Sequence, residues 1–130
     1  AVEAAKGGIA VPLLKADEAM SEMAVAKGRR ILMLATAKRA KEWCDLGVTR
    51  MESGDTSGAV VAFSKAIFLQ PHNSFYYQRR GDQFLRLCDF QSALLNYRKA
   101  YSLDKTNTLV KQQLAMIHFV QVSGLPPRHK

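Results

Sequence analysis

The sequence contains few of the residues that hold small folds together covalently or through a metal. Its 130 residues include two cysteines, Cys44 and Cys88, which form no CxxC pair. The three histidines, His72, His118 and His129, share no ligand spacing. The pattern argues against a disulfide scaffold and against a metal site. Two isolated thiols instead predict a reducing compartment, and we expect the cytoplasm.

Long apolar runs and catalytic groupings are absent as well. A membrane-spanning helix needs about 20 consecutive apolar residues, and the sequence has no such run. It also has no nucleophile–base pair, no paired carboxylates and no glycine-rich phosphate loop on positions that a helical fold would expose. We therefore expect a protein that is not an enzyme and needs no cofactor. The chain begins with Ala1 and not with Met, which predicts a processed product or a part of a longer protein.

Positive charge is plentiful, and it gives one hypothesis about function. The net charge is +8, with 19 Lys and Arg against 11 Asp and Glu. The densest basic stretch has no acidic residue within it and consists of Lys27, Arg29, Arg30, Lys38, Arg39 and Lys41. Such a cluster can bind nucleic acid or an acidic surface. A solvated helix face is the favoured interpretation, because no aromatic residues alternate with these charges to stack on bases.

The sequence repeats itself at an offset of 34 residues. Identical residues at this offset are the pairs Gly47/Gly81, Asp55/Asp89, Ala59/Ala93, Lys65/Lys99, Ala66/Ala100, Leu69/Leu103 and Asn73/Asn107. Aromatic residues also recur, at Trp43 and Tyr77 and at Phe63 and Tyr97. A period of this length predicts stacked helical hairpins.

Polar residues mark where the helices of each repeat unit should begin. Asp55 and Asp89 precede apolar stretches of 3–4 spacing, and their side chains can accept the free N–H groups of a first helical turn. Asn73 and Asn107 are placed to do the same for the helices that follow them. Pro71 separates the two units. Each unit is therefore predicted to contain two helices.

With these residues placed, the sequence resembles the tetratricopeptide repeat family. The first unit carries the signature at Trp43, Leu46, Gly47, Ala59, Phe63, Ala66 and Pro71. The second unit carries it at Tyr77, Gly81, Phe84, Ala93, Tyr97 and Ala100. Three positions depart from the pattern: Arg50 replaces an aromatic residue, Arg80 a large apolar residue and Lys105 a proline. The resemblance covers residues 40–122 and implies an all-α fold, a right-handed stack of antiparallel helical hairpins ended by a closing helix.

This fold divides the chain into consecutive segments. They are a flexible N-terminus (1–12), an N-terminal helical segment (13–39), two repeat units (40–73 and 74–106), a closing helix (107–123) and a tail (124–130). Gly7, Gly8 and Pro12 predict that the first dozen residues are loop-like. The stretch 13–27 can form an amphipathic helix, and 30–51 can form one long helix.

The packing of the repeat units follows from residue size. In the long helix of residues 30–51, we expect Ile31, Leu34 and Trp43 to face inward. We expect the two signature glycines, Gly47 and Gly81, to allow close helix approach. The small residues Ala59 and Ala93 are predicted to lie opposite them, and the aromatic residues of the signature are predicted to form the core.

The resemblance also implies where a partner would bind. Tetratricopeptide repeats present a concave groove, lined by the first helix of each hairpin, to protein or peptide partners. The matching residues are Lys41, Cys44, Val48, Met51, Phe75, Gln78, Arg79, Asp82, Leu85, Gln112 and Met116. Family members that clamp chaperone C-terminal tails use lysine, asparagine and arginine at positions occupied here by Cys44, Val48, Arg79, Leu109 and Gln113, so we expect no binding to such tails. Nucleic acid is a disfavoured partner.

The segment QRRGDQF contains the tripeptide Arg80-Gly81-Asp82, which adhesion receptors read on loops. Because Gly81 is the packing glycine of the second unit, the tripeptide is predicted to lie inside a helix, which excludes an adhesion loop. Arg79 and Asp82 are predicted to form a weak ion pair on the groove side. The stem of Arg80 is expected to be buried, with its charged head reaching out to solvent.

Overall fold

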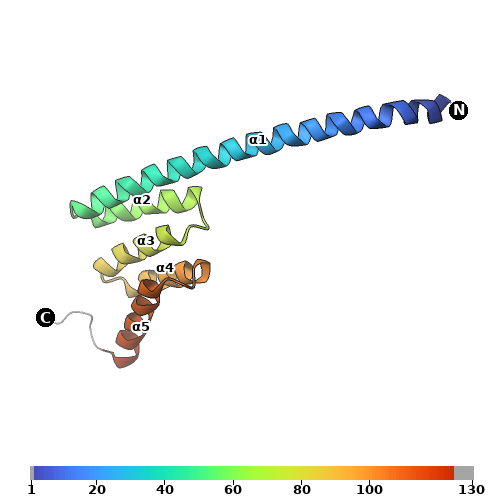
Figure 1. Ribbon diagram of the computed structural model, residues 1–130. Helices are drawn as coiled ribbons and strands as arrows, with labels where there is room; N and C mark the ends of the chain where they lie inside the picture. The colour runs from blue at the N-terminus through green and yellow to red at the C-terminus, as the bar shows by residue number, and fades with distance from the viewer. Residues whose placement is uncertain (1, 125–130) are drawn as a thin grey trace. The chain divides into compact units, whose positions relative to one another are not determined.

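The computed structural model describes the backbone of residues 2–124 and the side chains of residues 16–124. Its five helices are α1 (Val2–Glu52), α2 (Thr56–Leu69), α3 (Ser74–Arg86), α4 (Phe90–Leu103) and α5 (Thr108–Ser123) (Figure 1). No strand occurs between residues 2 and 124. The chain comprises two compact units, one up to Ala35 and one from Thr36 onward. The predicted all-α class is confirmed.

The second compact unit, from Thr36 onward, is built from helices that pack against one another in chain order. α3 contacts both α2 and α4, and α4 contacts α5 (Figure 1). The end of α1 is joined to α2 by a hydrogen bond from the Arg50 guanidinium to the Gly58 carbonyl, 3.1 Å long. Short turns connect the helices, so consecutive helices run antiparallel. This confirms the predicted stack of helical hairpins with α5 as the closing helix.

The predicted helix caps are all present. The carboxylates of Asp55 and Asp89 accept the N–H of the residue three positions further on, at 2.9 and 3.1 Å. The side-chain oxygens of Asn73 and Asn107 accept N–H groups of the first turns of α3 and α5, at 3.0 and 3.2 Å. Each cap satisfies a donor that has no partner within its own helix. The four helix starts are therefore set by local residues.

The turn inside each hairpin has the same geometry in both repeat units. Gly54 and Cys88, 34 residues apart, both adopt left-handed backbone conformations, with φ of 88° and 59°. The N–H of the aspartate that follows each of them donates to a carbonyl five residues earlier, at 2.8 and 2.9 Å. This bond pattern ends a helix with a left-handed residue, a position that favours glycine. Cys88 therefore occupies a glycine position.

The two signature glycines lie against aromatic rings. A Cβ atom built on Gly47 would lie 2.6 Å from the Phe63 ring, and one built on Gly81 would lie 3.0 Å from the Tyr97 ring. The first distance is shorter than a carbon–carbon contact tolerates and the second is tighter than most, so the close approach expected of the glycines is present. The atoms nearest to each built Cβ belong to the aromatic ring of the following helix.

The alanines of the signature lie in the core that surrounds these rings. Ala59 and Ala93 are fully buried members of this core, and their predicted position opposite the glycines stays a prediction. The buried signature residues are Gly47, Ala59, Phe63, Ala66, Tyr77, Gly81, Ala93, Tyr97 and Ala100. Trp43, Leu46 and Phe84 are half-buried, and Pro71 is exposed. Apart from Trp43 and Phe84, which are only partly covered, the predicted aromatic core is present.

Arg80 departs from the expected conformation. Its guanidinium does not reach out to solvent but donates from Nε to Asn96 Oδ1 at 2.7 Å and from Nη1 to Ser64 Oγ at 3.1 Å. These partners lie on α4 and α2, so one side chain of α3 is bonded to both neighbouring helices. Burial lowers the pKa of the Arg80 guanidinium. The guanidinium turns inward because the side chains of Asn96 and Ser64 replace water as its hydrogen-bond partners.

The early part of α1 also differs from the sequence-based expectation. Residues 2–12 are helical, although Gly7, Gly8 and Pro12 predicted a loop. Proline and glycine raise the free energy of a helix without forbidding its backbone angles, so the surrounding residues can continue it. Ile31 and Leu34 were expected to face inward but are 58% and 66% exposed. The described core begins at Ala40, because α2 is only long enough to cover the last turns of α1.

The tripeptide Arg80-Gly81-Asp82 lies inside α3, as predicted. Within the described chain no ion pair joins Arg79 to Asp82, which corrects the expected pairing. Asp82 instead accepts a hydrogen bond from the Tyr97 hydroxyl. Arg79 lies over the Phe75 ring, 4.8 Å from its centroid. Each charge is thus held by an aromatic side chain and not by the other charge.

Candidate partner-binding groove

The residues predicted to line the groove come from α1, α3 and α5, and their surroundings differ. Cys44 is only 5% exposed and belongs to the core together with Tyr76. Burial raises the pKa of its thiol. Cys44 therefore offers no surface to a partner, which corrects the prediction. Val48 is half-buried and packs against the same core.

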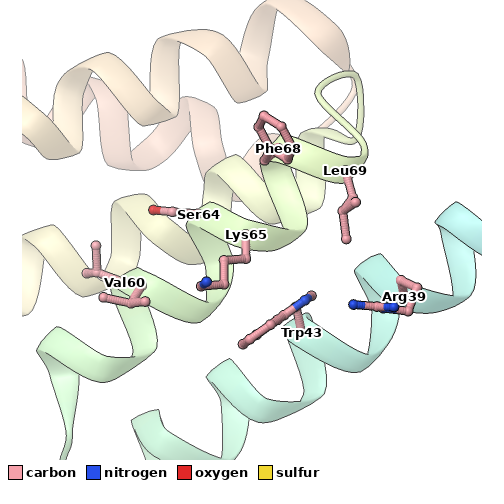
Figure 2. Close-up of a pocket in the computed structure, with 8 residues that line it drawn as sticks. Arg39, Trp43, Val60, Ser64, Lys65, Phe68 and Leu69 are labelled. Carbon is pink, nitrogen blue, oxygen red and sulfur yellow. The ribbon is translucent and has the colours of Figure 1, made fainter.

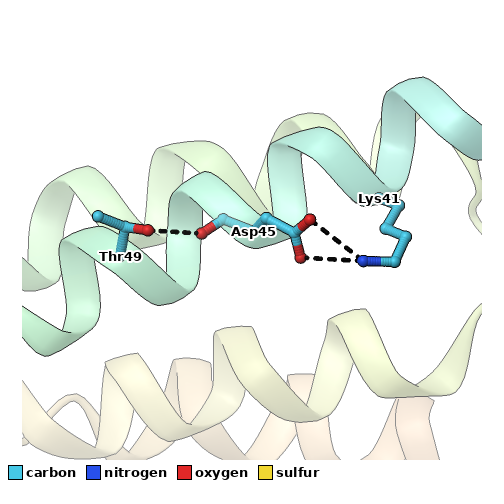
Figure 3. A network of polar contacts seen from close by, with 3 residues as sticks. All are labelled: Lys41, Asp45 and Thr49. Carbon is cyan, nitrogen blue, oxygen red and sulfur yellow. Dashed lines mark hydrogen bonds and ion pairs between the residues drawn. The ribbon is translucent and has the colours of Figure 1, made fainter.

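Lys41 is exposed and forms an ion pair with Asp45, one turn further along its own helix. Figure 3 shows its ammonium beside Asp45, with Nζ 3.1 Å from Oδ2. The Thr49 hydroxyl donates to the Asp45 carbonyl at 3.0 Å, one turn further along α1. An exposed pair of this spacing contributes roughly 0.3–0.5 kcal/mol to the helix. The ion pair holds Lys41 and Asp45 together on this face of α1, and both side chains stay exposed to solvent.

Two further predicted residues, Gln78 and Phe75, lie on α3 and differ in their contacts. The Gln78 amide oxygen accepts a hydrogen bond from the Asn107 side chain at 2.8 Å, which ties α3 to the start of α5. Phe75 is partly exposed beneath the Arg79 guanidinium and lies edge-on to Tyr76. Gln112 and Met116, on α5, are exposed. These residues are thus accessible at α3 and α5, with Gln78 partly occupied.

One cavity brings together side chains from α1, α3 and α5. We call it the Gln83 pocket. It has a volume of about 440 Å³ and is lined by Met51 of α1, by Arg79, Asp82, Gln83, Leu85 and Arg86 of α3, and by Gln113 of α5. Four of these residues were predicted for the groove. Gln83 and Arg86 were not among the predicted residues, and Gln113 was considered only as a clamp position.

The floor of the Gln83 pocket is unusually polar. Gln83 is 0% exposed, and neither its amide nitrogen nor its amide oxygen has a hydrogen-bond partner. The Nε atom of Arg79 is buried and unpartnered as well. Burial raises the pKa of the neighbouring Asp82 carboxyl, an effect opposed by the Tyr97 hydroxyl and by Arg79.

A second cavity continues from Leu85 and Arg86 towards α5. Its volume is about 490 Å³, and its lining is mainly apolar, with Phe90, Met116 and Ile117 among its residues. Leu85 belongs to both cavities. The structure thus places Met51, Arg79, Asp82, Leu85 and Met116 along two adjoining cavities, and it places Lys41, Phe75 and Gln112 outside both.

A third cavity lies between α1 and α2, and no sequence pattern indicated a site there. It measures about 590 Å³, and Arg39, Trp43 and Lys65 are among its lining residues (Figure 2). The Lys65 ammonium lies 4.9 Å from the centroid of the Trp43 ring. The equivalent pair one repeat later, Lys99 and Tyr77, has the same arrangement at 6.0 Å. The recurrence at both units indicates that this contact belongs to the repeat architecture.

The basic stretch considered for nucleic-acid binding is exposed throughout. Lys27, Arg29 and Arg30 belong to the first unit, and Lys38, Arg39 and Lys41 to the second. Its binding role stays a prediction. Among residues 16–124, no three His, Cys, Asp or Glu side chains are grouped so that they could hold a metal ion. Within the part of the chain that the structure describes, no helix combines the length and the apolar character needed to cross a membrane.

Comparisons with known proteins agree with this architecture. A search of protein-family models finds no match. The chain is 33% identical over 92 residues to tetratricopeptide repeat protein 16 of Homo sapiens. The aligned region covers 71% of this chain and 10% of that relative. The Mus musculus protein of the same name is 33% identical over 93 residues, covering 72% of the chain and 12% of the relative. The chain thus spans about a tenth of the length of these relatives.

Solved structures share the helical arrangement. The Arabidopsis OM64 TPR domain superposes with a TM-score of 0.64 at 26% identity, over 68% of this chain and 73% of that one. The second TPR of Spaghetti (RPAP3), bound to the HSP90 peptide SRMEEVD, superposes with a TM-score of 0.66 at 14% identity, over 70% of this chain and 83% of that one. The second likeness concerns the fold alone.

Proposed function

Because this chain belongs to the tetratricopeptide repeat family, we propose that it is a non-enzymatic protein-interaction module that binds a segment of a partner protein in its groove. We define the groove as the two adjoining cavities at α1, α3 and α5, together with Phe75 beside them. One observation carries the proposal: Met51 of α1, Arg79 of α3 and Gln113 of α5 line a single cavity. A surface shared by successive repeats can follow an extended segment along its length.

The character of the groove supports this role. Met116 is 44% exposed beside the apolar second cavity, and flexible methionine side chains adapt to varied apolar partners. Arg79 and Arg86 add charge, and Phe75 adds an exposed ring. That the Spaghetti domains are seen with a bound peptide supports a peptide segment as the type of ligand. The combination suits a segment that alternates apolar and polar side chains.

The test compares partner capture by groove and control variants. Wild-type chain, a Phe75→Glu/Met116→Glu variant and a Phe68→Glu variant are used as baits, and bound proteins are quantified by mass spectrometry. Phe68 is a suitable control because it is 84% exposed on α2, away from both groove cavities. We expect the groove variant to lose partners that the control retains, with unchanged circular dichroism. A groove variant that retains every partner would overturn the proposal.

The nucleic-acid alternative predicts a different result. Binding through the basic stretch would weaken steeply as salt rises, because neutralised phosphates release counterions. Titration of RNA and DNA at two salt concentrations therefore separates the two functions. Groove binding predicts no such nucleic-acid affinity and no effect of Phe75→Glu/Met116→Glu on it.

A further inference from the structure

The first compact unit is a helical segment whose described side chains are all exposed. Every side chain from residue 16 to residue 35 is open to solvent, and the described core begins only at Ala40. The large apolar side chains among them are Met20, Met23, Val25 and the run 31–34. Most helices are held by the packing of an apolar face, and a helix without such packing is marginal in water. Residues 16–35, which we call the α1 arm, therefore have apolar surface for contact with another molecule.

One face of the α1 arm carries most of this apolar surface. Four large apolar residues and one lysine recur at spacings of three or four and share the face: Met20, Met23, Lys27, Ile31 and Leu34. The four apolar side chains are 58–71% exposed. The lysine can lay its stem along apolar surface and keep its ammonium in water. An apolar stripe interrupted by a single lysine is typical of a helix that pairs with another helix, and the lysine restricts the register.

The charges of the α1 arm are separated by sign along its length. All its acidic residues precede residue 23, and all its basic residues follow residue 26: Asp17, Glu18 and Glu22, then Lys27, Arg29 and Arg30. The only ion pair within residues 16–124 joins Lys41 to Asp45, so these six charges are unpaired inside the described chain. The arm thus has an acidic half and a basic half, each with three charges that can be matched from outside.

Two arms match each other only when they run antiparallel. A parallel pair would place acid against acid and base against base, which is unfavourable. In an antiparallel pair centred between Ala26 and Lys27, the acidic half of each arm faces the basic half of the other. Met20 then comes nearly level with Leu34 of the second copy, and Glu22 with Arg30 of the second copy. Each favourable contact occurs twice, because such a pair has two-fold symmetry.

We propose that two copies of this chain form a dimer through antiparallel pairing of their α1 arms. The occupant of the exposed face is a second copy because the arm carries its own electrostatic complement. A uniformly acidic or uniformly basic partner would match one half of the arm and oppose the other. The dimer is independent of the proposed groove function, since no groove residue lies in the arm. It carries two grooves, so it can hold two segments of one partner at once.

The first experiment measures self-association of the full chain by sedimentation equilibrium at low and at high salt. We expect the mass of two chains, with a dissociation constant about tenfold higher at high salt because salt screens exposed ion pairs. A chain that stays monomeric at its highest soluble concentration would overturn the proposal. A dimer whose dissociation constant does not rise with salt would overturn the matching of charges.

Charge reversal tests whether the two halves of the arm recognise each other. Glu18→Lys/Glu22→Lys makes the arm basic throughout its centre, and Arg29→Glu/Arg30→Glu makes it acidic. We expect each variant alone to dimerise at least about tenfold more weakly than wild type, and a mixture of the two to form a heterodimer. Arg98→Glu/Lys105→Glu makes the same charge change at exposed residues outside the arm and should not weaken the dimer. Undiminished self-association of either arm variant, or a mixture that does not associate, would contradict the pairing.

The apolar stripe is tested by paired substitutions of equal chemistry. Met20→Ser/Leu34→Ser should weaken the dimer at least about tenfold, because apolar area is lost at two symmetric contacts. Phe119→Ser/Val122→Ser removes exposed apolar side chains of α5 and should leave it unchanged. Lys27→Leu should strengthen the dimer, since the lysine interrupts the stripe. A dimer that depends on the α5 residues and not on the arm would place the interface elsewhere and overturn the proposal.

The direction of the arms is measured with paired spin labels. Ala24→Cys and Ala35→Cys are labelled separately in a Cys88→Ser background, in which the remaining Cys44 is buried. In an antiparallel pair, each residue away from the centre adds about 3 Å along the helix axis to the separation of the two labels. We expect the labels at residue 35 to be about 15 Å further apart than those at residue 24. Equal separations at the two positions would mean parallel arms and would overturn the proposed pairing.

Discussion

Gly54 and Cys88 occupy equivalent turns, but the same backbone conformation has a different cost at each. Glycine adopts a positive φ freely, whereas any residue with a Cβ atom is strained there by roughly 1–2 kcal/mol. Cys88 has a φ of 59° and is a free, exposed thiol. The second hairpin therefore holds a strained residue where the first does not.

Substitution of Cys88 by glycine should stabilise the protein. Relief of the backbone strain exceeds the extra entropy that glycine gives the unfolded chain, so we expect the free energy of unfolding to rise by about 0.5–1 kcal/mol. Urea unfolding followed by circular dichroism measures it. Cys88→Ala serves as the control, since it removes the thiol and keeps the strain. Equal stability of the two variants would contradict the explanation.

The opposite result is expected at the packing glycines. Gly47→Ala would place a carbon 2.6 Å from the Phe63 ring, and Gly81→Ala one 3.0 Å from the Tyr97 ring. We expect Gly47→Ala to destabilise by about 1–3 kcal/mol and Gly81→Ala by less. Gly28 has nothing within 4 Å, so Gly28→Ala should not destabilise and should raise helicity. The order of unfolding midpoints checks all three, and a Gly47→Ala midpoint at or above wild type would refute it.

Asp82 should make stability depend on pH. Burial raises the pKa of its carboxyl above the ordinary value of 3.8, so the folded chain holds this proton more tightly than the unfolded chain. Its contribution is fully present below pH 3.8 and is lost as pH rises through the folded pKa. We compare the unfolding free energies of wild type and Asp82→Asn. The difference, wild type minus variant, should fall as pH rises from 3.8 through the folded pKa of Asp82 and then stay constant. A difference that rises with pH would show the opposite shift.

At the scale of the elements, Arg80 links three helices. Its guanidinium bonds Ser64 on α2 and Asn96 on α4, and Asn96 is buried. In the family pattern this position holds an apolar residue, so the helices here are joined by polar contacts where packing alone would serve. Removing one member leaves another buried polar group without its partner.

A double-mutant cycle measures this coupling. Arg80→Leu should destabilise by about 1–3 kcal/mol, because Asn96 Oδ1 loses its donor. Arg80→Leu combined with Asn96→Ala should cost less than the sum of the single changes, with a coupling of about 0.5–3 kcal/mol. Ser64→Ala removes only one of the two hydrogen-bond partners of Arg80 and should cost less than Arg80→Leu. Strict additivity of the two changes would mean that the 2.7 Å bond contributes no stability.

The starts of α2, α3, α4 and α5 could be predicted from local residues. Asp55, Asn73, Asp89 and Asn107 cap their helices through atoms two or three residues away, so no tertiary information was needed. The start of α1 could not be predicted in this way. Residues 2–12 are helical despite two glycines and a proline, because their propensities are weak preferences and not prohibitions.

At the scale of the whole molecule, the groove predicts what the module should not bind. The positions where chaperone-tail clamps carry their residues hold the buried Cys44, the half-buried Val48 and Gln113 among others. The Spaghetti domains share the fold and are seen with the HSP90 peptide SRMEEVD. Likeness of fold does not supply the side chains that hold a ligand.

We therefore expect no measurable heat of binding when the peptide SRMEEVD is titrated into this chain by calorimetry. The second TPR of Spaghetti is the positive control under the same conditions. Tight binding by this chain would show that Arg79 and its neighbours form a clamp of a different composition.

The sequence alone determined the repeat period, the hairpins, the caps and the packing role of Gly47 and Gly81, because each depends on spacing along the chain. The tertiary structure decided which side chains meet across helices. It turned Arg80 inward to Ser64 and Asn96, and it buried Cys44 and Gln83. Hydrogen bonding and burial are set by distances between residues far apart in the chain, and no local pattern encodes those distances.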